Sequence, residues 1–209
     1  MKIINPSFEI LDELDGAAML RKIEAAARTC YKSEGKITET SALTMVQNLI
    51  KRGHESPLEH EKVSVRIICD RGVSHELVRH RIASYSQEST RYCNYSHGKF
   101  GGELTFIKPC FWNEGGEMYK GWKAWVAASE RIYLAAIEEG ATPQEARCLL
   151  PNSLKTEIVV TMNLREWRHF FRLRAAPGAH PQMQEIARPL LAEFVQRIPV
   201  VFDDLSDLL

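Results

Sequence analysis

Residues 61–70 read EKVSVRIICD, and apolar and polar side chains alternate along this stretch. The apolar members of the stretch are Val63, Val65, Ile67 and Cys69. Because successive side chains of a strand point to opposite faces, the alternation predicts a strand with one buried face. Half-burial favours an antiparallel or mixed sheet, because the strands of all-parallel sheets are covered on both faces.

Helical and strand signals alternate on both sides of this strand. Upstream, the sequence predicts a short strand within 2–11 and helices over 16–31 and about 41–53. Downstream, the expected elements are a helix over 72–80, a loop over 96–103, a strand over 103–108, a helix over 115–139, a strand over 154–162 and helices over 164–174 and 181–197. Thr142 and Glu145 have the form of a capping box that begins a short helix, and Asn163 is expected to cap the helix over 164–174. The pattern predicts an α/β fold of the α+β type, with a central, mostly antiparallel or mixed sheet flanked by helices.

Composition narrows the class of protein. The 209 residues suffice for one sizeable core and predict a single domain over 1–209. The 27 basic and 27 acidic residues cancel, so no overall field recruits nucleic acid or an anionic membrane. Five cysteines without a CxxC pair favour structural thiols in a reducing cytoplasm. No leader or membrane span is readable, so we expect a soluble cytoplasmic protein.

Residues 79–92 read RHRIASYSQESTRY and carry the most specific pattern in the chain. Arg79, His80 and Arg81 are followed seven residues later by Ser89 and then by Arg91. Between residues 63 and 98 every lysine or arginine position is an arginine, and the planar guanidinium suits phosphate. The segment predicts a local anion site, although an arginine cluster can also be a solvated charged face.

Arg174 is a second pointer to a ligand. It shares a helical stripe with Trp167, Phe170 and Phe171, and a buried guanidinium needs a carboxylate or a ligand oxygen. The alternatives are an internal salt bridge and a side chain that extends to solvent from the helix end. The remaining arginines of this helix are predicted on the opposite, solvent-exposed or interface side: Arg165, Arg168 and Arg172. On the helix over 115–139, the predicted inner residues are Met118, Trp122, Trp125, Ser129, Ile132 and Ala136.

The sequence shows no other common metal-binding, nucleotide-binding or nucleophile motif. His75 and His80 are five residues apart and would point about 140° from one another on a helix, so they fail as a zinc pair. No GxGxxG follows a strand and no GK[ST] loop occurs, which excludes a Rossmann site or a P-loop. Ser89 lacks a positioned base in the sequence, so we interpret it as a ligand contact.

The RHR triplet with its serine resembles the signature of the flavin-dependent thymidylate synthases (the ThyX family). The similarity extends, in the family's order, to further stretches: GHESPLEH at 53–60, HELVRHR at 75–81, ARCLLPNS at 146–153, TMNLREWRHFFRLR at 161–174 and AHPQMQEIAR at 179–188. The resemblance implies a homotetramer with active sites shared between subunits and a non-Rossmann FAD site. It also implies methylation of dUMP to dTMP, with 5,10-methylenetetrahydrofolate as carbon donor and NADPH as reductant.

The resemblance assigns roles to individual residues. The implied FAD contacts are Ser56, Arg79, His80, Arg81, Gln87, Asn163, Arg165 and His169. The implied dUMP contacts are Glu76, Arg79, Gln87, Glu88, Ser89, Thr90, Arg91, Arg147 and Arg174. Arg174 is the implied catalytic residue, because a fixed positive charge at the uracil ring would make C5 nucleophilic. Second-tier candidates are His54, Glu59 and His180. No metal ligand is implied.

Two rival functions come from other classes. An arginine-rich nucleotide- or RNA-binding module would explain the arginines and aromatics, but it predicts a basic balance that the chain lacks. A metal-dependent hydrolase would explain the seven histidines, but their spacings do not match metal motifs. Bound flavin, bound zinc or retained RNA would distinguish the three.

Overall fold

The computed structural model describes residues 1–98 and 101–209, and these form two compact units. Unit 1 comprises Met1–Ser7, Ile67–Arg79 and Tyr85–Val159. Unit 2 comprises Phe8–Arg66, His80–Ser84 and Val160–Leu209. The loop predicted over 96–103 includes residues 99 and 100, which lie outside the described part of the chain.

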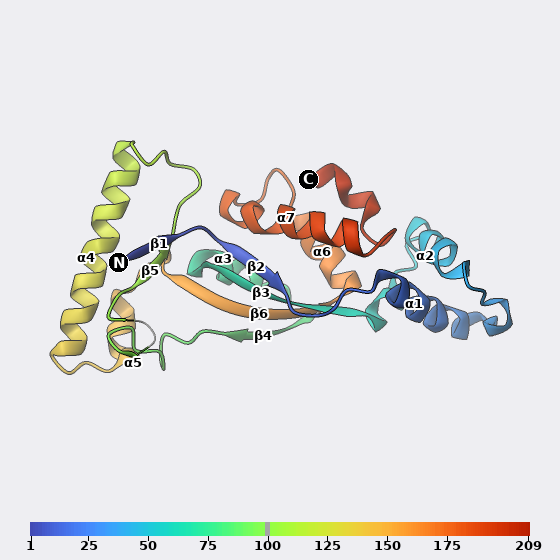
Figure 1. Cartoon of the computed structure of the whole chain (residues 1–209), viewed down its shortest axis with the longest axis horizontal. Coiled ribbons are helices and arrows are strands. Elements are labelled where there is room, and N and C mark those ends of the chain that lie inside the picture. The colour runs from blue at the N-terminus through green and yellow to red at the C-terminus, as the bar shows by residue number, and fades with distance from the viewer. Residues whose placement is uncertain (99–100) are drawn as a thin grey trace. The chain divides into compact units, whose positions relative to one another are not determined.

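A four-stranded antiparallel sheet with the order β2-β3-β6-β4 is the main β structure, as the sequence predicts (Figure 1). Its strands are β2 (Ser7–Ile10), β3 (Lys62–Asp70), β4 (Ala83–Gln87) and β6 (Lys155–Asn163). The alternation along β3 is confirmed, because all four of its predicted inward residues are completely buried: Val63, Val65, Ile67 and Cys69. Alternate residues of β6 are buried in the same way. Local side-chain direction therefore decides which face of these strands is covered.

Unit 1 is built around a second, two-stranded sheet and a long helix. Strand β1 (Lys2–Ile4) pairs in parallel with β5 (Thr105–Ile107). The helices of this unit are α3 (Arg71–Leu77), α4 (Glu117–Glu138), α5 (Pro143–Ala146) and the 3₁₀ turn η4 (Arg147–Leu149). Phe106 of β5 packs with Val126 and Tyr133 of α4 in one buried hydrophobic cluster. α4 therefore covers β5, and Gly140 follows its end with a φ of 99°.

The buried face of α4 differs from the prediction. Its buried residues are Tyr119, Val126, Ser129 and Tyr133. Met118, Trp125 and Ile132, predicted to face inward, are 63%, 56% and 55% exposed. The prediction is wrong for these three residues, whereas Ser129 is buried and Trp122 and Ala136 pack against the core cluster as expected. The helix carries apolar residues on two faces, and only one of them meets the core of its own unit. The second face is an exposed apolar stripe at seven-residue spacing.

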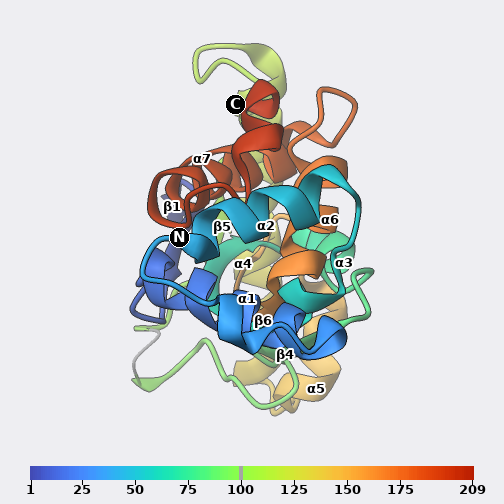
Figure 2. The same ribbon diagram turned by 90° about the vertical axis from the view of Figure 1, so that its right-hand side faces the viewer.

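Unit 2 has two helix pairs. α1 (Gly16–Tyr31) packs against α2 (Ser41–Lys51), and Figure 2 views this pair from the front. α6 (Leu164–Arg174) packs against α7 (Pro181–Arg197). Short 3₁₀ segments complete the unit: η1 (Glu34–Lys36), η2 (Ser56–His60) and η5 (Asp203–Leu208). No helix among the described residues is long and apolar enough to cross a lipid bilayer.

An aromatic core holds α6, α7 and the C-terminal segment together. Trp167 stacks on Phe171 at 5.7 Å between ring centroids, and Phe194 of α7 contacts both rings at 5.3 Å. The Trp167 indole N–H donates to the Val63 carbonyl at 3.0 Å, which ties α6 to β3 within unit 2. Asn163 caps α6, as predicted, by accepting a hydrogen bond from the Glu166 N–H at 2.8 Å. These contacts fix the position of α6, which carries most of the candidate site.

Candidate active site

The RHR triplet connects α3 to β4. α3 ends at Leu77, close to the predicted end of this helix, and the triplet follows after one residue. Arg79 and Arg81 are exposed, whereas His80 between them is only 3% exposed. The triplet therefore presents two guanidinium groups to solvent and buries one imidazole.

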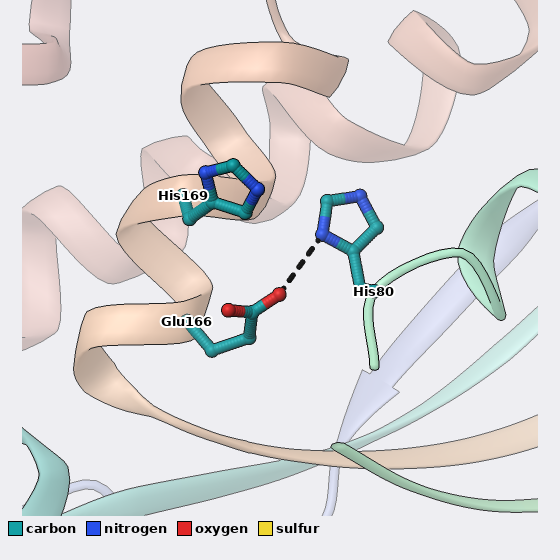
Figure 3. Close-up of side chains that lie close together, drawn as sticks. All are labelled: His80, Glu166 and His169. Carbon is teal, nitrogen blue, oxygen red and sulfur yellow. Dashed lines mark hydrogen bonds and ion pairs between the residues drawn. The ribbon is translucent and has the colours of Figure 1, made fainter. Parts of the chain in front are cut away.

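The buried imidazole of His80 lies between two side chains of α6. Its Nδ1 atom is 3.1 Å from Oε1 of Glu166, as Figure 3 shows. The Nε–H of Arg174 donates to the other ring nitrogen, Nε2, at 3.2 Å. Phe170, also on α6, meets the ring edge to face at 5.1 Å between centroids. Both nitrogens of His80 are thus engaged within the protein.

These contacts determine the protonation of His80. Arginine Nε always carries a hydrogen, so Nε2 of His80 must accept with its lone pair, and the ring proton then lies on Nδ1 and points to Glu166. Burial, together with the nearby charges of Arg174 and His169, lowers the pKa of His80 to about 4. The imidazole is therefore neutral at pH 7. Burial likewise raises the pKa of Glu166.

Three side chains of types that can bind metal ions lie close together around His80. Within the described residues, the ligand atoms of His80, Glu166 and His169 lie within 4.8 Å of one another (Figure 3). The Nε2 lone pair of His80 accepts from Arg174, however, and the guanidinium adds a positive charge beside the cluster. A hydrogen-bonded histidine–carboxylate pair accounts for this geometry, and the adjacent positive charge disfavours a cation there.

A pocket of about 480 Å³ opens beside this cluster in unit 2. It is lined by Glu55, Glu59, Ile82, Asn163, Arg165, Glu166, His169 and Arg172. Three of the predicted FAD contacts, Asn163, Arg165 and His169, therefore share one pocket. Its volume lies in the range of roughly 300–1,000 Å³ that is usual for small-molecule sites.

Ser56 lines a second, smaller pocket of about 270 Å³ in the same unit. The two pockets share Glu55 and Arg165 in their linings, so they lie next to one another. His54, a second-tier candidate, also lines the smaller pocket, whereas Glu59 pairs with Arg165 at 2.5 Å. The structure thus brings the η2 loop and the start of α6 together around adjacent cavities.

Arg168 corrects one prediction about α6. The sequence places it on a solvent-exposed or interface face with Arg165 and Arg172, but its side chain is completely buried. Its guanidinium donates two hydrogen bonds of 2.7 Å to the Asp204 carboxylate and another of 3.2 Å to Glu55. It also donates to the Val201 carbonyl. Buried charge is tolerated only when it is paired, and these distant partners supply the pairing.

The predicted phosphate-binding segment lies in unit 1, and two of its side chains serve as anchors. The Gln87 amide donates to the hydroxyls of Ser74 and Thr156 at 3.0 and 3.1 Å. The Glu88 carboxylate accepts from the Tyr95 hydroxyl and from Lys155 Nζ, each at 2.7 Å. Burial and the neighbouring Glu88 raise the pKa of Tyr95, so its hydroxyl keeps its proton.

Ser89, Thr90 and Arg91 follow Glu88 and form a turn. Ser89 Oγ accepts from the Arg91 N–H at 3.3 Å, and the Tyr92 N–H donates to the Ser89 carbonyl at 3.1 Å. Thr90 is 7% exposed, whereas Arg91 is exposed and its Nε donates to Gln144 at 3.2 Å. An exposed guanidinium therefore stands beside a compact turn, in which the N–H groups of Arg91, Tyr92 and Cys93 all donate to Ser89.

The remaining predicted residues are distributed over both units. Glu76 is half-buried on α3, Arg147 is exposed at the start of η4, and His180 is exposed at the start of α7. All predicted dUMP contacts except Arg174 belong to unit 1. All predicted FAD contacts except Arg79 and Gln87 belong to unit 2. The two units therefore divide the predicted ligands between them.

Sequence reasoning missed several residues of the site. Glu55 lines both pockets and binds Arg168, Glu166 binds His80, and Lys155 holds Glu88. Glu55 is adjacent to Ser56 in the stretch that carries the resemblance, which is the one signal that pointed towards it. Glu166 likewise lies in the stretch 161–174 that carries the resemblance. Nothing local singles out Lys155, since its partner Glu88 is remote in sequence.

Comparison of the sequence with known proteins finds a matching family and several similar proteins. The profile of the Thy1 family, described as "Thymidylate synthase complementing protein", matches residues 11–200. A flavin-dependent thymidylate synthase of Pyrococcus furiosus is 39% identical over 163 residues, which are 78% of this chain and 66% of that relative. The corresponding protein of Pyrococcus horikoshii is 36% identical over 94% of this chain and 79% of its own length. That of Mycolicibacterium gilvum is 34% identical over 95% and 84%.

A solved structure has the same fold. The UMP/dUMP methylase PolB from Streptomyces cacaoi, bound with 5-Br dUMP, superimposes with a TM-score of 0.79 at 21% identity. The match covers 99% of this chain and 97% of that chain. It supports the α/β architecture with an antiparallel sheet flanked by helices.

Proposed function

The chain belongs to the Thy1 family, whose relatives include flavin-dependent thymidylate synthases, and on this premise we propose that it methylates dUMP to dTMP. In this proposal 5,10-methylenetetrahydrofolate donates the carbon and NADPH is the reductant. One observation carries the proposal: three predicted FAD contacts line one pocket in the unit that also holds Arg174. We further propose that residues 1–209 act as a single synthase domain.

The residues around the pocket fit FAD. Arg165, Arg172 and His169 can donate to phosphate or carbonyl oxygens, and Ile82 offers an apolar contact. Arg165 and Arg172 pair with Glu59 and Glu55 of the same pocket, so each would share its guanidinium between a carboxylate and the ligand. Ser56 adds a hydroxyl in the adjoining pocket, and the exposed Arg81 follows the buried His80 on the same connection. When bound, FAD supplies the redox chemistry, the hydride that completes the methyl group. The protein's part is to hold this group and to place charge.

Arg174 would act on the uracil ring of dUMP. A fixed guanidinium near N3 and O2 stabilises negative charge there, and this charge makes C5 nucleophilic. Arg174 is half-buried and hydrogen-bonded through Nε to His80, which supports a defined orientation of its side chain. The Arg174→Ala variant should therefore lose methyl transfer and keep most of its bound flavin.

The turn at residues 87–91 would bind the dUMP phosphate. The side chains of Gln87 and Glu88 are held within unit 1, so the ligand contacts would come from backbone N–H groups, the Ser89 hydroxyl and Arg91. Arg147, Glu76 and Arg79 are the further proposed contacts to dUMP.

We propose a homotetramer with shared active sites, located in the cytoplasm. The exposed apolar stripe of α4, formed by Met118, Trp125 and Ile132, supports an assembly, because contiguous exposed apolar surface usually marks an interaction site. All five cysteines are free thiols, which supports a reducing compartment. A Trp125→Glu variant should form smaller species in light scattering. An unchanged mass would show that this stripe does not form a subunit interface.

One assay tests the proposed function. Purified protein should be yellow and should oxidise NADPH in a manner that depends on dUMP and methylenetetrahydrofolate, and chromatography should detect dTMP. Colourless protein with stoichiometric zinc would instead indicate a hydrolase. Retention of RNA by colourless, metal-free protein would indicate a binding module. NADPH oxidation that yields no dTMP would overturn the assigned reaction.

A further inference from the structure

We propose that His80 is a positioning residue: its neutral imidazole, hydrogen-bonded between Glu166 and Arg174, holds the Arg174 guanidinium in the orientation that methyl transfer needs. The resemblance assigns His80 to FAD, but its side chain is 2% exposed and both ring nitrogens already have protein partners. The inference rests on the proposed function of Arg174. It adds a physical reason for the histidine within the RHR triplet.

His80 lies between two residues of α6 that are too far apart along the helix to meet directly. Glu166 and Arg174 are eight residues apart on one helix, which corresponds to a rise of about 12 Å. The imidazole spans part of this distance, because Nδ1 contacts Oε1 of Glu166 at 3.1 Å and Nε2 contacts Nε of Arg174 at 3.2 Å. His80 thus couples the first turn of α6 to its last turn.

Both the ring and the carboxylate are held in place. Phe170 packs against the His80 ring at 5.1 Å between centroids, and His169 lies at 5.5 Å. Glu166 is 7% exposed, and its backbone N–H is fixed by the cap residue Asn163. A hydrogen bond donated to such a constrained ring restricts the rotamers of Arg174 more than a bond to a solvated partner would. The orientation of Arg174 is therefore set before any ligand arrives.

The direction of each hydrogen bond makes the neutral ring essential. A proton on Nε2 would face the Nε–H of Arg174, so two donors and two positive charges would meet. Glu166, His169 and Arg174 are titratable or charged groups of α6 that face His80. The low pKa of His80, about 4, keeps the ring neutral through the physiological range.

Two substitutions of His80 test its hydrogen bonds to Glu166 and to Arg174 separately. The amide oxygen of His80→Gln can occupy the place of Nε2 and accept from Arg174, whereas His80→Asn reproduces the Nδ1 position and can reach only Glu166. We expect His80→Asn to lose about 100-fold in kcat with dUMP, since misplacing a catalytic group by about 1 Å costs this much. His80→Gln should lose less than about 10-fold. His97→Asn, at an exposed histidine of unit 1, is the matched control.

The amount of bound flavin distinguishes a positioning role of His80 from a direct contact between His80 and FAD. His80→Asn should retain FAD at the wild-type ratio, measured by absorbance after gel filtration, together with its fold, measured by circular dichroism. Loss of FAD from His80→Asn and His80→Gln alike would overturn the inference and support a direct flavin contact. Equal kcat losses in the two variants would overturn it as well.

A second measurement is independent of activity. Long-range ¹H–¹⁵N spectra of ring-labelled protein distinguish histidine tautomers, and His80 should show a protonated Nδ1 and an unprotonated Nε2 at pH 7. An Nε2–H tautomer or a charged ring at pH 7 would overturn the inference even if the enzyme made dTMP. An inactive protein with the expected tautomer would instead refute the proposed function and leave the hydrogen-bonded bridge in place.

Discussion

Replacing Arg168 with methionine tests the buried ion pair that joins α6 to the C-terminal segment. Methionine keeps much of the side-chain length but removes the charge, so Glu55 and Asp204 lose their main partner. Breaking a buried ion pair by removing one member costs roughly 3–5 kcal/mol. The lower end applies here, because the Asp204 side chain is 44% exposed and water can solvate it. We therefore expect the free energy of unfolding to fall by about 3 kcal/mol.

Arg172 provides a matched control on the same helix. Its guanidinium meets the same two carboxylates, at 3.3 Å from Glu55 and 3.6 Å from Asp204, but its side chain is 43% exposed. Exposed ion pairs contribute about 1 kcal/mol or less, so Arg172→Met should cost no more than this. The comparison mainly tests burial, since helix, charge and the two carboxylate partners are shared; Arg168 alone also donates to the Val201 carbonyl.

Urea unfolding followed by tryptophan fluorescence and circular dichroism measures both variants. With an m-value of about 2 kcal/mol/M, the Arg168→Met midpoint should move by about 1.5 M and the Arg172→Met midpoint by less than about 0.5 M. Trp167, beside Arg168 in the aromatic core, reports on unit 2. Equal shifts in the two variants would refute the argument that burial makes Arg168 the stronger contact.

Three further predictions concern the carboxylates and the two ligand-binding regions. Partial burial alone would raise the pKa of Asp204, but hydrogen bonds and charge from its arginine partners lower it, so the stability that Asp204 adds is present above its unfolded pKa and lost as pH falls. The difference in unfolding midpoint between wild type and Asp204→Asn should accordingly shrink from pH 7 to pH 3, and a constant difference would contradict this. Lys155→Met should loosen the turn at Glu88 and raise the KM for dUMP about tenfold with FAD retained, whereas Lys123→Met, at an exposed lysine, should leave KM unchanged. Arg81→Ala should lose FAD during purification, and a fully flavin-loaded variant would remove Arg81 from the proposed cofactor site.

Much of the fold follows from local patterns. The β3 strand, the Asn163 cap of α6 and the Thr142–Glu145 capping box all appear as predicted. Each depends on residues within a few positions of one another, so side-chain direction and short-range hydrogen bonds suffice to define it. The sequence of α4 shows the limit of this reasoning, because a helix with apolar residues on two faces does not reveal which face its own core covers.

Part of the candidate site could likewise be predicted from the sequence, and part could not. Residue identities at 79–92 and 161–174 were enough to nominate Arg174, the RHR triplet and the serine turn. They did not reveal that Arg168 is buried, because its partners Glu55 and Asp204 lie 113 and 36 positions away. Burial of a charge depends on such remote partners, and helical periodicity carries no information about them.

The sequence by itself thus determined the strand pattern and the helix caps, and it nominated the residues that we propose bind phosphate, since these depend on residue type and short spacing. Tertiary structure alone decided which arginine is buried, which face of α4 is covered and which side chains His80 contacts. His80 and Arg174 are separated by 94 positions, and a contact between them exists only because the chain between them folds back. A hydrogen bond needs two atoms about 3 Å apart, and only the folded chain brings these two together.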